Sequence, residues 1–324
     1  MKKSLVLLAS LFLLIMGCNK SGSNDENLPM DGESASASQR SCSAQDVLEE
    51  QMKADPSLRQ RMNDIEQFTK RVIENPQQYR LVNGIIEIPV VFNVLYRTTA
   101  QNVSLAQLQS QIDVLNEDFG GTNADHNLTS TYNEVKAGNI SIRFTLDAVN
   151  RRSTNTVSWS TNDAMKKNAK GIAPTSPTTK LNIWVCNMGG GILGYAQFPG
   201  GSTATDGVVL DDNATGRTGT ASAPFHKGRT ATHEVGHWMN LRHIWGDATC
   251  GTDQVGDTPT HNTANYGCPS AGHLSTCSGT PVEMTMNYMD YTDDACMYMF
   301  SLGQQSRMMA VFASGGARSS FAQP

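Results

Sequence analysis

The stretch ATHEVGHWMNLRHIWGD, residues 231–247, limits what this chain can fold into more than any other, because it holds three of the seven histidines. Residues four apart lie on one face of an α-helix, so His233 and His237 can direct both imidazoles at a single metal ion. Glu234 lies beside them, where its carboxylate can polarise a bound water. A continued helix would carry His243 out of reach, so the chain must turn sharply near residue 240.

Two helical histidines and one beyond a turn leave a fourth coordination position for water. Such open coordination is typical of a catalytic zinc, whereas structural zinc sites are usually closed by four protein ligands. The pattern therefore predicts one catalytic Zn2+ held by His233, His237 and His243, with Glu234 as the general base. The alternative is coincidence, in which the three histidines lie on a polar surface and bind no metal.

The composition suits an exported enzyme and argues against nucleic acid as a partner. With 324 residues, 39% of them hydrophobic, the chain can bury one or two substantial cores. Its formal net charge is −5, and it has no basic stripe that could follow a phosphate backbone.

The N-terminus has the pattern of an export signal. Lys2 and Lys3 precede an apolar run at residues 5–16, which is short for a membrane span. The run ends in LLIMGCNK, which resembles a bacterial lipobox, so residues 1–17 are expected to be a lipoprotein signal peptide and Cys18 the lipidated residue. The alternative is an ordinary signal peptide with a chance cysteine. We expect a protein anchored by this lipid to a bacterial outer membrane, or released after processing.

Two further segments are expected before the folded domain. Residues 18–41 have almost no apolar content and are predicted to form a flexible tether. Residues 42–79 are predicted to be a helical prosegment, because apolar side chains recur at helical spacing and Asn75-Pro76 ends the pattern. The alternative is a helix that simply packs on the fold. No later segment is long and apolar enough to span a membrane.

The folded domain is predicted to occupy residues 80–324 and to be of the α/β (α+β) class. Ser104 is a plausible cap for a helix that Gly120-Gly121 closes. Alternating with it are β-branched, apolar runs typical of strands: GIIEIPVVFNVLYR, ISIRFTLDAV, KLNIWVCNM and TDGVVLDD. The segment GGGILGYAQFPGG, between the last two, has the weak alternation of an exposed edge strand.

The seven cysteines of an exported chain suggest disulfides. Four lie after the histidine cluster, at positions 250, 268, 277 and 296, and spacing alone allows three pairings. Cys186 lies in an apolar strand and is expected to be a buried free thiol. Cys42 lies in the prosegment, and its thiolate could fill the fourth zinc position and keep the enzyme latent. The alternative for Cys42 is an inert thiol.

The segment TDQVGDTP, residues 252–259, carries oxygen ligands at a spacing that suits calcium. Asp253, Asp257 and Thr258 are the candidates, with Asp253 and Thr258 as the predicted ligands of a structural Ca2+. The alternative is an Asp-rich turn that holds no ion.

The motifs resemble those of a known clan. HEVGHWMNLRH is similar to the signature of metzincin metalloproteases, and NYMDY to their Met-turn. Within the clan the chain most resembles the pappalysins, through IEIPVVFNVLY, LNIWVCNMGGGILGYAQFP, DGVVLDD, DTPTHNTANYGCP and MTMNYMDYTDDACMYMFSLGQQSRM, which together span about residues 85–310. The resemblance implies a twisted mixed sheet with a backing helix and an active-site helix in residues 80–243. It implies a loop-rich, disulfide-stapled subdomain in residues 244–324.

The resemblance also implies roles for single residues. Met289 matches the methionine that forms a hydrophobic floor beneath the metal. Tyr291 matches a tyrosine that can stabilise the oxyanion, the alternative being a plain core tyrosine. Asn240 stands where the signature usually has glycine, and asparagine is the residue that best replaces glycine at left-handed backbone angles. We therefore expect the turn towards His243 to be retained.

The pappalysin resemblance favours the disulfides Cys250–Cys277 and Cys268–Cys296. It also implies that a substrate peptide lies antiparallel to the edge strand GILGYAQFP. Asp293 and Asp294 follow the Met-turn, close to where metzincins form the wall of the pocket after the scissile bond. Bacterial pappalysins favour arginine after the cut, so the resemblance implies a preference for basic residues there; the alternative is that the two aspartates are simply solvated.

These observations predict an exported zinc-dependent endopeptidase that cleaves proteins or peptides and acts as a monomer. Its only membrane contact would be the N-terminal lipid. One alternative is a zinc amidase or deacetylase acting on cell-wall or glycan material. The other is a non-catalytic surface lipoprotein on a degenerate protease fold, which the intact histidines and Glu234 argue against.

Overall fold

The computed structural model describes residues 39–78, 84–128 and 131–322. The expected signal peptide, Cys18 and tether residues 18–38 lie outside these ranges. Within them, no helix combines the length and the apolar character that a membrane crossing requires.

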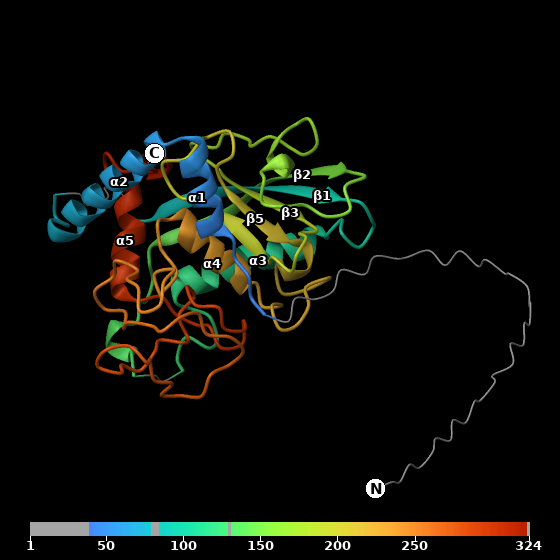
Figure 1. Ribbon diagram of the computed structural model, residues 1–324. Helices are drawn as coiled ribbons and strands as arrows, with labels where there is room; N and C mark the ends of the chain where they lie inside the picture. The colour runs from blue at the N-terminus through green and yellow to red at the C-terminus, as the bar shows by residue number, and fades with distance from the viewer. Residues whose placement is uncertain (1–38, 79–83, 129–130, 323–324) are drawn as a thin grey trace, which may run out of the picture. The chain divides into compact units, whose positions relative to one another are not determined.

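Five strands form one mixed sheet in the order β2-β1-β3-β5-β4 (Figure 1). Neighbouring strands are parallel except for the last pair, β5 and β4, which is antiparallel. The mixed α/β arrangement expected from the sequence is confirmed. In chain order the strands are β1 (Ile86–Tyr96), β2 (Ile142–Ser153), β3 (Leu181–Cys186), β4 (Gly194–Ala196) and β5 (Val208–Asp211).

Both faces of the sheet are covered, which explains why β3 is mostly apolar and buried along its whole length. Ile183 and Val185 of β3 belong to the core that the strands share with α3 (Leu105–Gly120) and α4 (Arg229–Trp238). Trp184, between them in sequence, packs on the opposite face with side chains from the loops that cover it. Alternate residues of a strand point to opposite faces, so all six residues of β3 are buried.

The backing helix α3 begins and ends where its sequence predicts. The Ser104 hydroxyl accepts a hydrogen bond from the backbone N–H of Gln107, 3.1 Å away, and so caps the first turn. Gly121 follows the helix in the left-handed conformation, with φ of 62°. Leu108, Ile112 and other apolar residues of one face pack on the sheet.

The helical segment before the sheet is two helices rather than one. They are α1 (Ala44–Ala54) and α2 (Ser57–Glu74), and Asp55-Pro56 separates them. A proline disfavours helical angles at the residue before it, and Asp55 adopts φ of −132° and ψ of 90°. The helix α2 packs along α5 (Leu302–Phe312), whereas α1 packs against β4 (Figure 1).

From residue 239 to residue 301 the chain contains no helix or strand, in agreement with the loop-rich subdomain that the resemblance implies. It then forms α5, which the sequence analysis missed. Its signal was present, because Ser301 and Gln304 form a capping box at its N-terminus. The remaining elements are short 3₁₀ turns: η1 (Asn133–Val135), η2 (Ala164–Lys166), η3 (Asp212–Ala214) and η4 (Ser319–Ala322).

Candidate metal centre

The helix α4 brings two of the three candidate ligands together. His233 and His237 lie one turn apart, and both are fully buried. The helix ends at Trp238, and Asn240 then adopts the left-handed φ of 71°. The N–H of Leu241 donates back to the carbonyl of Gly236 at 2.9 Å, which closes the turn. The chain thus leaves the helix at the residue where a turn was expected, with asparagine in place of glycine.

The turn returns His243 to the other two histidines. The Nε2 atom of His237 lies 3.2 Å from Nε2 of His233 and 3.0 Å from Nε2 of His243. The thiol of Cys42 joins them, and the four ligand atoms all lie within 4.8 Å of one another. Among the described residues this is the only such group of three or more His, Cys, Asp or Glu side chains.

The hydrogen bonds on the outer ring nitrogens fit a metal ion between the inner ones. Nδ1 of His233 lies 2.7 Å from the carbonyl oxygen of Tyr288, and Nδ1 of His237 lies 2.8 Å from that of Leu241. Nδ1 of His243 lies 2.5 Å from a carboxylate oxygen of Asp247. Because these partners only accept, the hydrogen of each neutral ring belongs on Nδ1, and the Nε2 lone pairs face one another.

Lone pairs directed at one another repel, and a cation between them would remove that repulsion. Zinc–nitrogen bonds of about 2.0–2.1 Å in tetrahedral geometry separate two ligand nitrogens by roughly 3.3 Å, close to the spacing found here. Burial and the neighbouring histidines also lower the pKa of His233 and His237, which keeps both imidazoles neutral and able to ligate. The residues present therefore fit a zinc ion.

Glu234 lies on α4 beside the ligands and is only 1% exposed. Its Oε2 accepts a hydrogen bond from the Cys42 thiol at 3.3 Å, and its Oε1 has no hydrogen-bond partner in the described part of the chain. Burial raises the pKa of Glu234 to about 8. Its Oε2 thus reaches the ligand cluster through Cys42, and a carboxyl group placed there can exchange a proton with a molecule bound at the metal.

Met289 and Tyr291 reach the centre from the loop after residue 280. Met289 is buried beneath α4, where a side chain at Gly236 would lie 2.5 Å from its sulfur. The ring of Tyr291 lies 4.9 Å from that of His243, and its hydroxyl donates to the carbonyl oxygen of Cys42 at 2.9 Å. The structure thus brings both residues to the histidines.

The segment before α1 enters the site along the edge strand. The N–H of Leu193 donates to the carbonyl of Ser41 at 2.9 Å, and the N–H of Ser43 donates to the carbonyl of Gly194 at 3.2 Å. Cys42 pairs with Gly194 in parallel orientation. The expectation of an exposed edge strand is therefore wrong for this form of the chain, because this segment and α1 bury β4.

Arg40 is a site residue that the sequence analysis missed, since it was assigned to the flexible tether. It is only 2% exposed, and its guanidinium lies 2.5 Å from the carboxylate of Asp294. It also donates to the hydroxyl of Thr230 at 3.1 Å and to the carbonyl of Thr292 at 3.2 Å. The only sequence signal was an arginine two residues before Cys42 in an otherwise polar tether.

Asp293 and Asp294 occupy different environments. Asp294 is fully buried and accepts hydrogen bonds from the backbone N–H groups of Lys227 and Arg229, at the start of α4. Asp293 is half-buried, and its backbone N–H donates to the carbonyl of Gly267. Of the two aspartates, Asp294 is therefore the one that contacts Arg40.

The proposed calcium segment forms a tight loop. Both oxygens of the Asp253 carboxylate accept the Thr258 hydroxyl, at 3.0 and 2.9 Å. Burial raises the pKa of Asp253 to about 6. Asp257 instead accepts hydrogen bonds from Ser301 and from the backbone of Gly303, at the start of α5.

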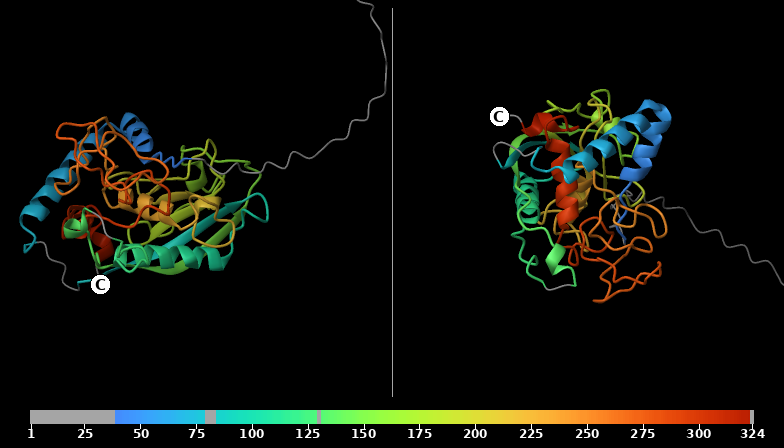
Figure 2. Two further views of the ribbon diagram at one scale, coloured as in Figure 1. Left: turned by 90° about the horizontal axis from the view of Figure 1, so that it is seen from below. Right: turned by 90° about the vertical axis from the view of Figure 1, so that its left-hand side faces the viewer.

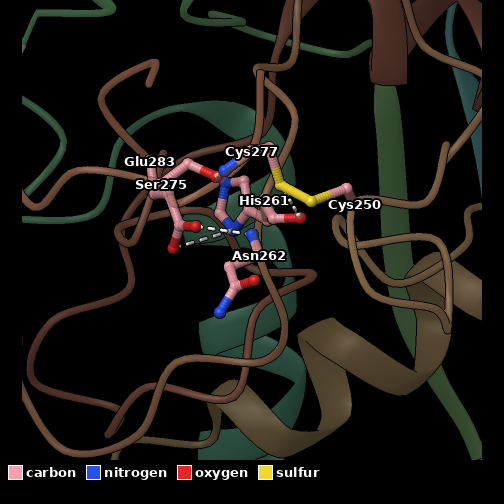
Figure 3. Close-up of a disulfide and its surroundings, with 6 residues drawn as sticks. All are labelled: Cys250, His261, Asn262, Ser275, Cys277 and Glu283. Carbon is pink, nitrogen blue, oxygen red and sulfur yellow. Dashed lines mark hydrogen bonds and ion pairs between the residues drawn. A yellow bond between two sulfur atoms is a disulfide. The ribbon is translucent and has the colours of Figure 1, made fainter. Parts of the chain in front are cut away.

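The cysteine pairs in the structure are those that the resemblance implied, Cys250–Cys277 and Cys268–Cys296. The first lies beside His261, with Glu283 close to the same ring (Figure 3). Cys186 is a buried free thiol, as expected, and burial raises its pKa.

Comparison with known proteins adds sequence relatives. A family model described as pregnancy-associated plasma protein-A matches residues 180–313. An extracellular metalloprotease of Verticillium alfalfae is 34% identical over 239 residues, which are 70% of this chain and 78% of that protein. Extracellular metalloprotease 1 of Coccidioides posadasii is 33% identical over 243 residues, or 70% of this chain and 77% of that one.

Two solved structures from Tannerella forsythia are also similar. A promirolysin mutant superposes with a TM-score of 0.78 at 41% identity, covering 87% of this chain and 97% of its own. Mature mirolysin in complex with a cleaved peptide superposes with a TM-score of 0.70 at 44% identity, covering 73% and 95%.

Proposed function

This chain belongs to the pappalysin family of zinc metalloendopeptidases, and we propose that His233, His237 and His243 are its metal ligands and Glu234 its general base. The observation that carries the assignment is the convergence of three buried Nε2 atoms, each on a ring whose Nδ1 is bonded to an oxygen. Relatives named as metalloproteases leave no support for the glycan amidase or for the non-catalytic lipoprotein.

The zinc ion, when bound, supplies Lewis-acid activation of water and of the scissile carbonyl. Glu234 accepts a proton from the attacking water and delivers it to the leaving amine, because its carboxyl group lies beside the ligand cluster, contacts Cys42 and keeps one oxygen without a partner. The Tyr291 hydroxyl already donates to a peptide carbonyl, that of Cys42. A substrate carbonyl in the same place would receive the same hydrogen bond as its oxygen gains negative charge.

The test compares the full-length chain with Glu234→Ala. Both are treated with trace trypsin, the trypsin is inhibited, and casein hydrolysis and bound zinc are measured. We expect equal zinc content and a loss of activity of about 10²- to 10⁴-fold in the variant, the usual range for a general base. Equal activity in both proteins would show that Glu234 has no such role. Absence of zinc from both would contradict the ligand assignment.

We infer that residues 42–79 keep the enzyme latent. Cys42 lies among the metal ligands, and its segment pairs with β4 in parallel, opposite to the antiparallel direction expected of a substrate. A reversed chain does not present its peptide bond to the catalytic groups in the cleavable orientation. The promirolysin structure covers 87% of this chain, whereas the mature mirolysin structure covers 73%. This difference supports the proposal that an N-terminal segment is removed from this chain on maturation.

The role of the Cys42 thiol in latency can be tested with a matched pair of variants. Cys42→Ala removes the sulfur from the cleft, so untreated full-length protein should become active or mature faster. Cys186→Ala removes the other free buried thiol, which lies on the opposite face of the sheet, and should leave latency unchanged. A Cys42→Ala zymogen as latent as the parent would contradict the proposal.

The pocket that holds Arg40 supports a preference for basic residues after the cut. Asp294 supplies a buried carboxylate, Thr230 a hydroxyl, and Phe225 an aromatic face 5.0 Å from the guanidinium. These groups form charge-assisted and cation–π contacts that a neutral side chain cannot make. Removal of the prosegment would free this pocket for an arginine or lysine of the substrate.

A peptide library should therefore show Arg and Lys enriched at the position after the cut. Asp294→Asn should reduce that preference by about 10- to 100-fold, since a hydrogen bond to a charged group contributes about 1.5–3 kcal/mol. Asp293→Asn removes the same charge outside the pocket and serves as the control. A library without basic enrichment would overturn the pocket assignment.

Two further features complete the proposal. We expect Asp253 and Thr258 to ligate calcium once the cation displaces the hydrogen bonds between them. We also expect Cys18 to carry a lipid that anchors the exported protein. Cys18→Ala should move the protein from the membrane fraction to the soluble fraction, and an unchanged distribution would exclude the anchor.

A further inference from the structure

We propose that Asp247 is a positioning residue for the metal centre, which orients the His243 ring and raises the affinity of the site for zinc. The proposal rests on the metal ligation described above. The carboxylate oxygen of Asp247 lies 2.5 Å from Nδ1 of His243. The corresponding partners of His233 and His237 are neutral backbone carbonyls, so His243 is the one of the three histidines whose Nδ1 is held by a carboxylate.

His243 needs such a partner more than the other two ligands do. His233 and His237 are part of α4, whose backbone hydrogen bonds fix their spacing. His243 lies beyond the helix, in a segment without regular structure. The orientation of its ring therefore depends on contacts made by neighbouring side chains.

The sequence HIWGD, residues 243–247, folds so that these contacts come from the same short loop. The N–H of Gly246 donates to the carbonyl of His243 at 2.8 Å, and Gly246 and Asp247 adopt left-handed φ angles of 65° and 58°. A side chain at position 246 would lie 2.4 Å from the backbone nitrogen of Thr252, so only glycine fits. Asp247 thus adopts an uncommon left-handed backbone angle at the place where its carboxylate contacts the His243 ring.

A second contact holds the face of the ring. The indole of Trp245 stacks on the imidazole of His243, with centroids 4.4 Å apart and planes 7° from parallel. Trp245 restrains the tilt of the imidazole, whereas Asp247 restrains its rotation in the plane and keeps the hydrogen on Nδ1. Nε2 is therefore left with its lone pair directed at the metal position.

A carboxylate in this place has two separable effects. It accepts the Nδ1 hydrogen, and it places a negative charge one imidazole away from the cation, which makes the ring a stronger donor. An asparagine side chain could still accept the hydrogen but would carry no charge. Alanine would remove both effects.

The experiment measures zinc affinity of the full-length chain by chelator competition. Asp247→Ala should lower the affinity by about 10- to 100-fold, the usual effect of losing such a partner. Asp247→Asn should lower it by a smaller factor, and, being nearly isosteric, it preserves the test if the alanine variant does not fold. Asp293→Asn removes a nearby charge that does not contact the ligands and should bind zinc like the parent.

The absorption spectrum of the cobalt-substituted proteins separates ligand positioning from a general loss of stability. The spectra of the Asp247 variants should differ from that of the parent, because the ligand field at the ion changes, whereas that of Asp293→Asn should not. Parental zinc affinity in Asp247→Ala would overturn the proposal. A parent that binds no zinc would instead contradict the metal site itself.

Discussion

Residues 86–238 and residues 239–301 build the metal centre by different means. In residues 86–238 the backbone groups pair within a sheet and two helices, and α4 places His233 and His237 by its regular repeat. Residues 239–301 have no helix or strand, and Figure 2 shows them as irregular, mostly orange loops. They nevertheless supply His243, Met289 and Tyr291. They are held instead by two disulfides and by buried side chains that bond to the backbone.

Two buried carboxylates show how the second region is tied together. Glu283 accepts the backbone N–H of Asn262 at 2.6 Å (Figure 3), and its other oxygen accepts the side chain of Asn265 at 2.7 Å. Asp290 accepts the backbone N–H groups of Asn265 and Tyr291, both at 2.8 Å. In a sheet, backbone N–H groups bond to the backbone carbonyls of a neighbouring strand. Here they bond to carboxylates instead, so each of these hydrogen bonds depends on one particular side chain. The comparison predicts that residues 239–301 lose stability when a disulfide or a side-chain-to-backbone hydrogen bond is removed. The sheet should instead lose stability when its core packing is changed.

Removal of one disulfide should have the largest effect. The bridge Cys250–Cys277 closes a separation of 27 residues, for which the chain-entropy model gives about 3.5 kcal/mol. We expect the double variant Cys250→Ser, Cys277→Ser to lose about that much free energy of unfolding, measured by urea denaturation. Cys186→Ala removes a thiol but no cross-link and should lose less. An unchanged urea midpoint in the double variant would refute the role given to the bridge.

The proposed prosegment, residues 42–79, should stabilise residues 239–301 through Arg307 of α5. This guanidinium is 1% exposed, lies 2.9 Å from Glu66 of α2, and donates to the carbonyls of Asn240 and Gln254. Glu66→Gln should destabilise the full-length chain by about 1.5–3 kcal/mol, because it removes the carboxylate that is bonded to the buried Arg307 guanidinium.

Thermal unfolding of the zymogen measures this loss, and Glu50→Gln provides the control. Glu50 pairs with Lys53 on the exposed surface, where an ion pair contributes about 0–1 kcal/mol. Equal effects of the two variants would show that the Glu66–Arg307 contact does not tie the prosegment to the loops.

Calcium should stabilise residues 239–301, and the size of this stabilisation should depend on pH. At 10 mM calcium, dissociation constants of about 10⁻⁴–10⁻³ M correspond to about 1.4–2.7 kcal/mol of stabilisation. If the proposed site exists, calcium would bind the carboxylate form of Asp253, whose pKa burial raises to about 6, so protons would compete with the ion below that pH. The calcium-induced rise in melting temperature should therefore be larger at pH 7.5 than at pH 5.5. Asp253→Asn should abolish it, and a rise equal to the parent's would exclude this site.

The turn at Asn240 should give the smallest effect. Its φ is 71°, and its side-chain nitrogen has no hydrogen-bond partner within the described residues, so the backbone angle is what selects the residue. Asn240→Ala should cost about 1 kcal/mol of stability, whereas Asn240→Gly should be neutral or slightly stabilising. Chemical denaturation compares the two, and a glycine variant less stable than the alanine variant would contradict this account.

Elements that depend on neighbouring residues were predictable from the sequence. The capping serine and closing glycine of α3, the apolar run of β3 and the histidine spacing of α4 all lie within short segments. The break at Pro56 and the capping box at Ser301 were also local signals, although neither was identified from the sequence. Contacts between distant segments had no comparable signal.

The sequence by itself determined that His233 and His237 face one point, because a helix repeats every few residues and needs no distant partner. Only the tertiary structure decided what surrounds that point. It brings Arg40 to Asp294 across 254 residues, and the Cys42 backbone to Tyr291 across 249. It also covers the edge strand with the segment before α1. Such contacts depend on how the whole chain packs, so no short stretch of sequence encodes them.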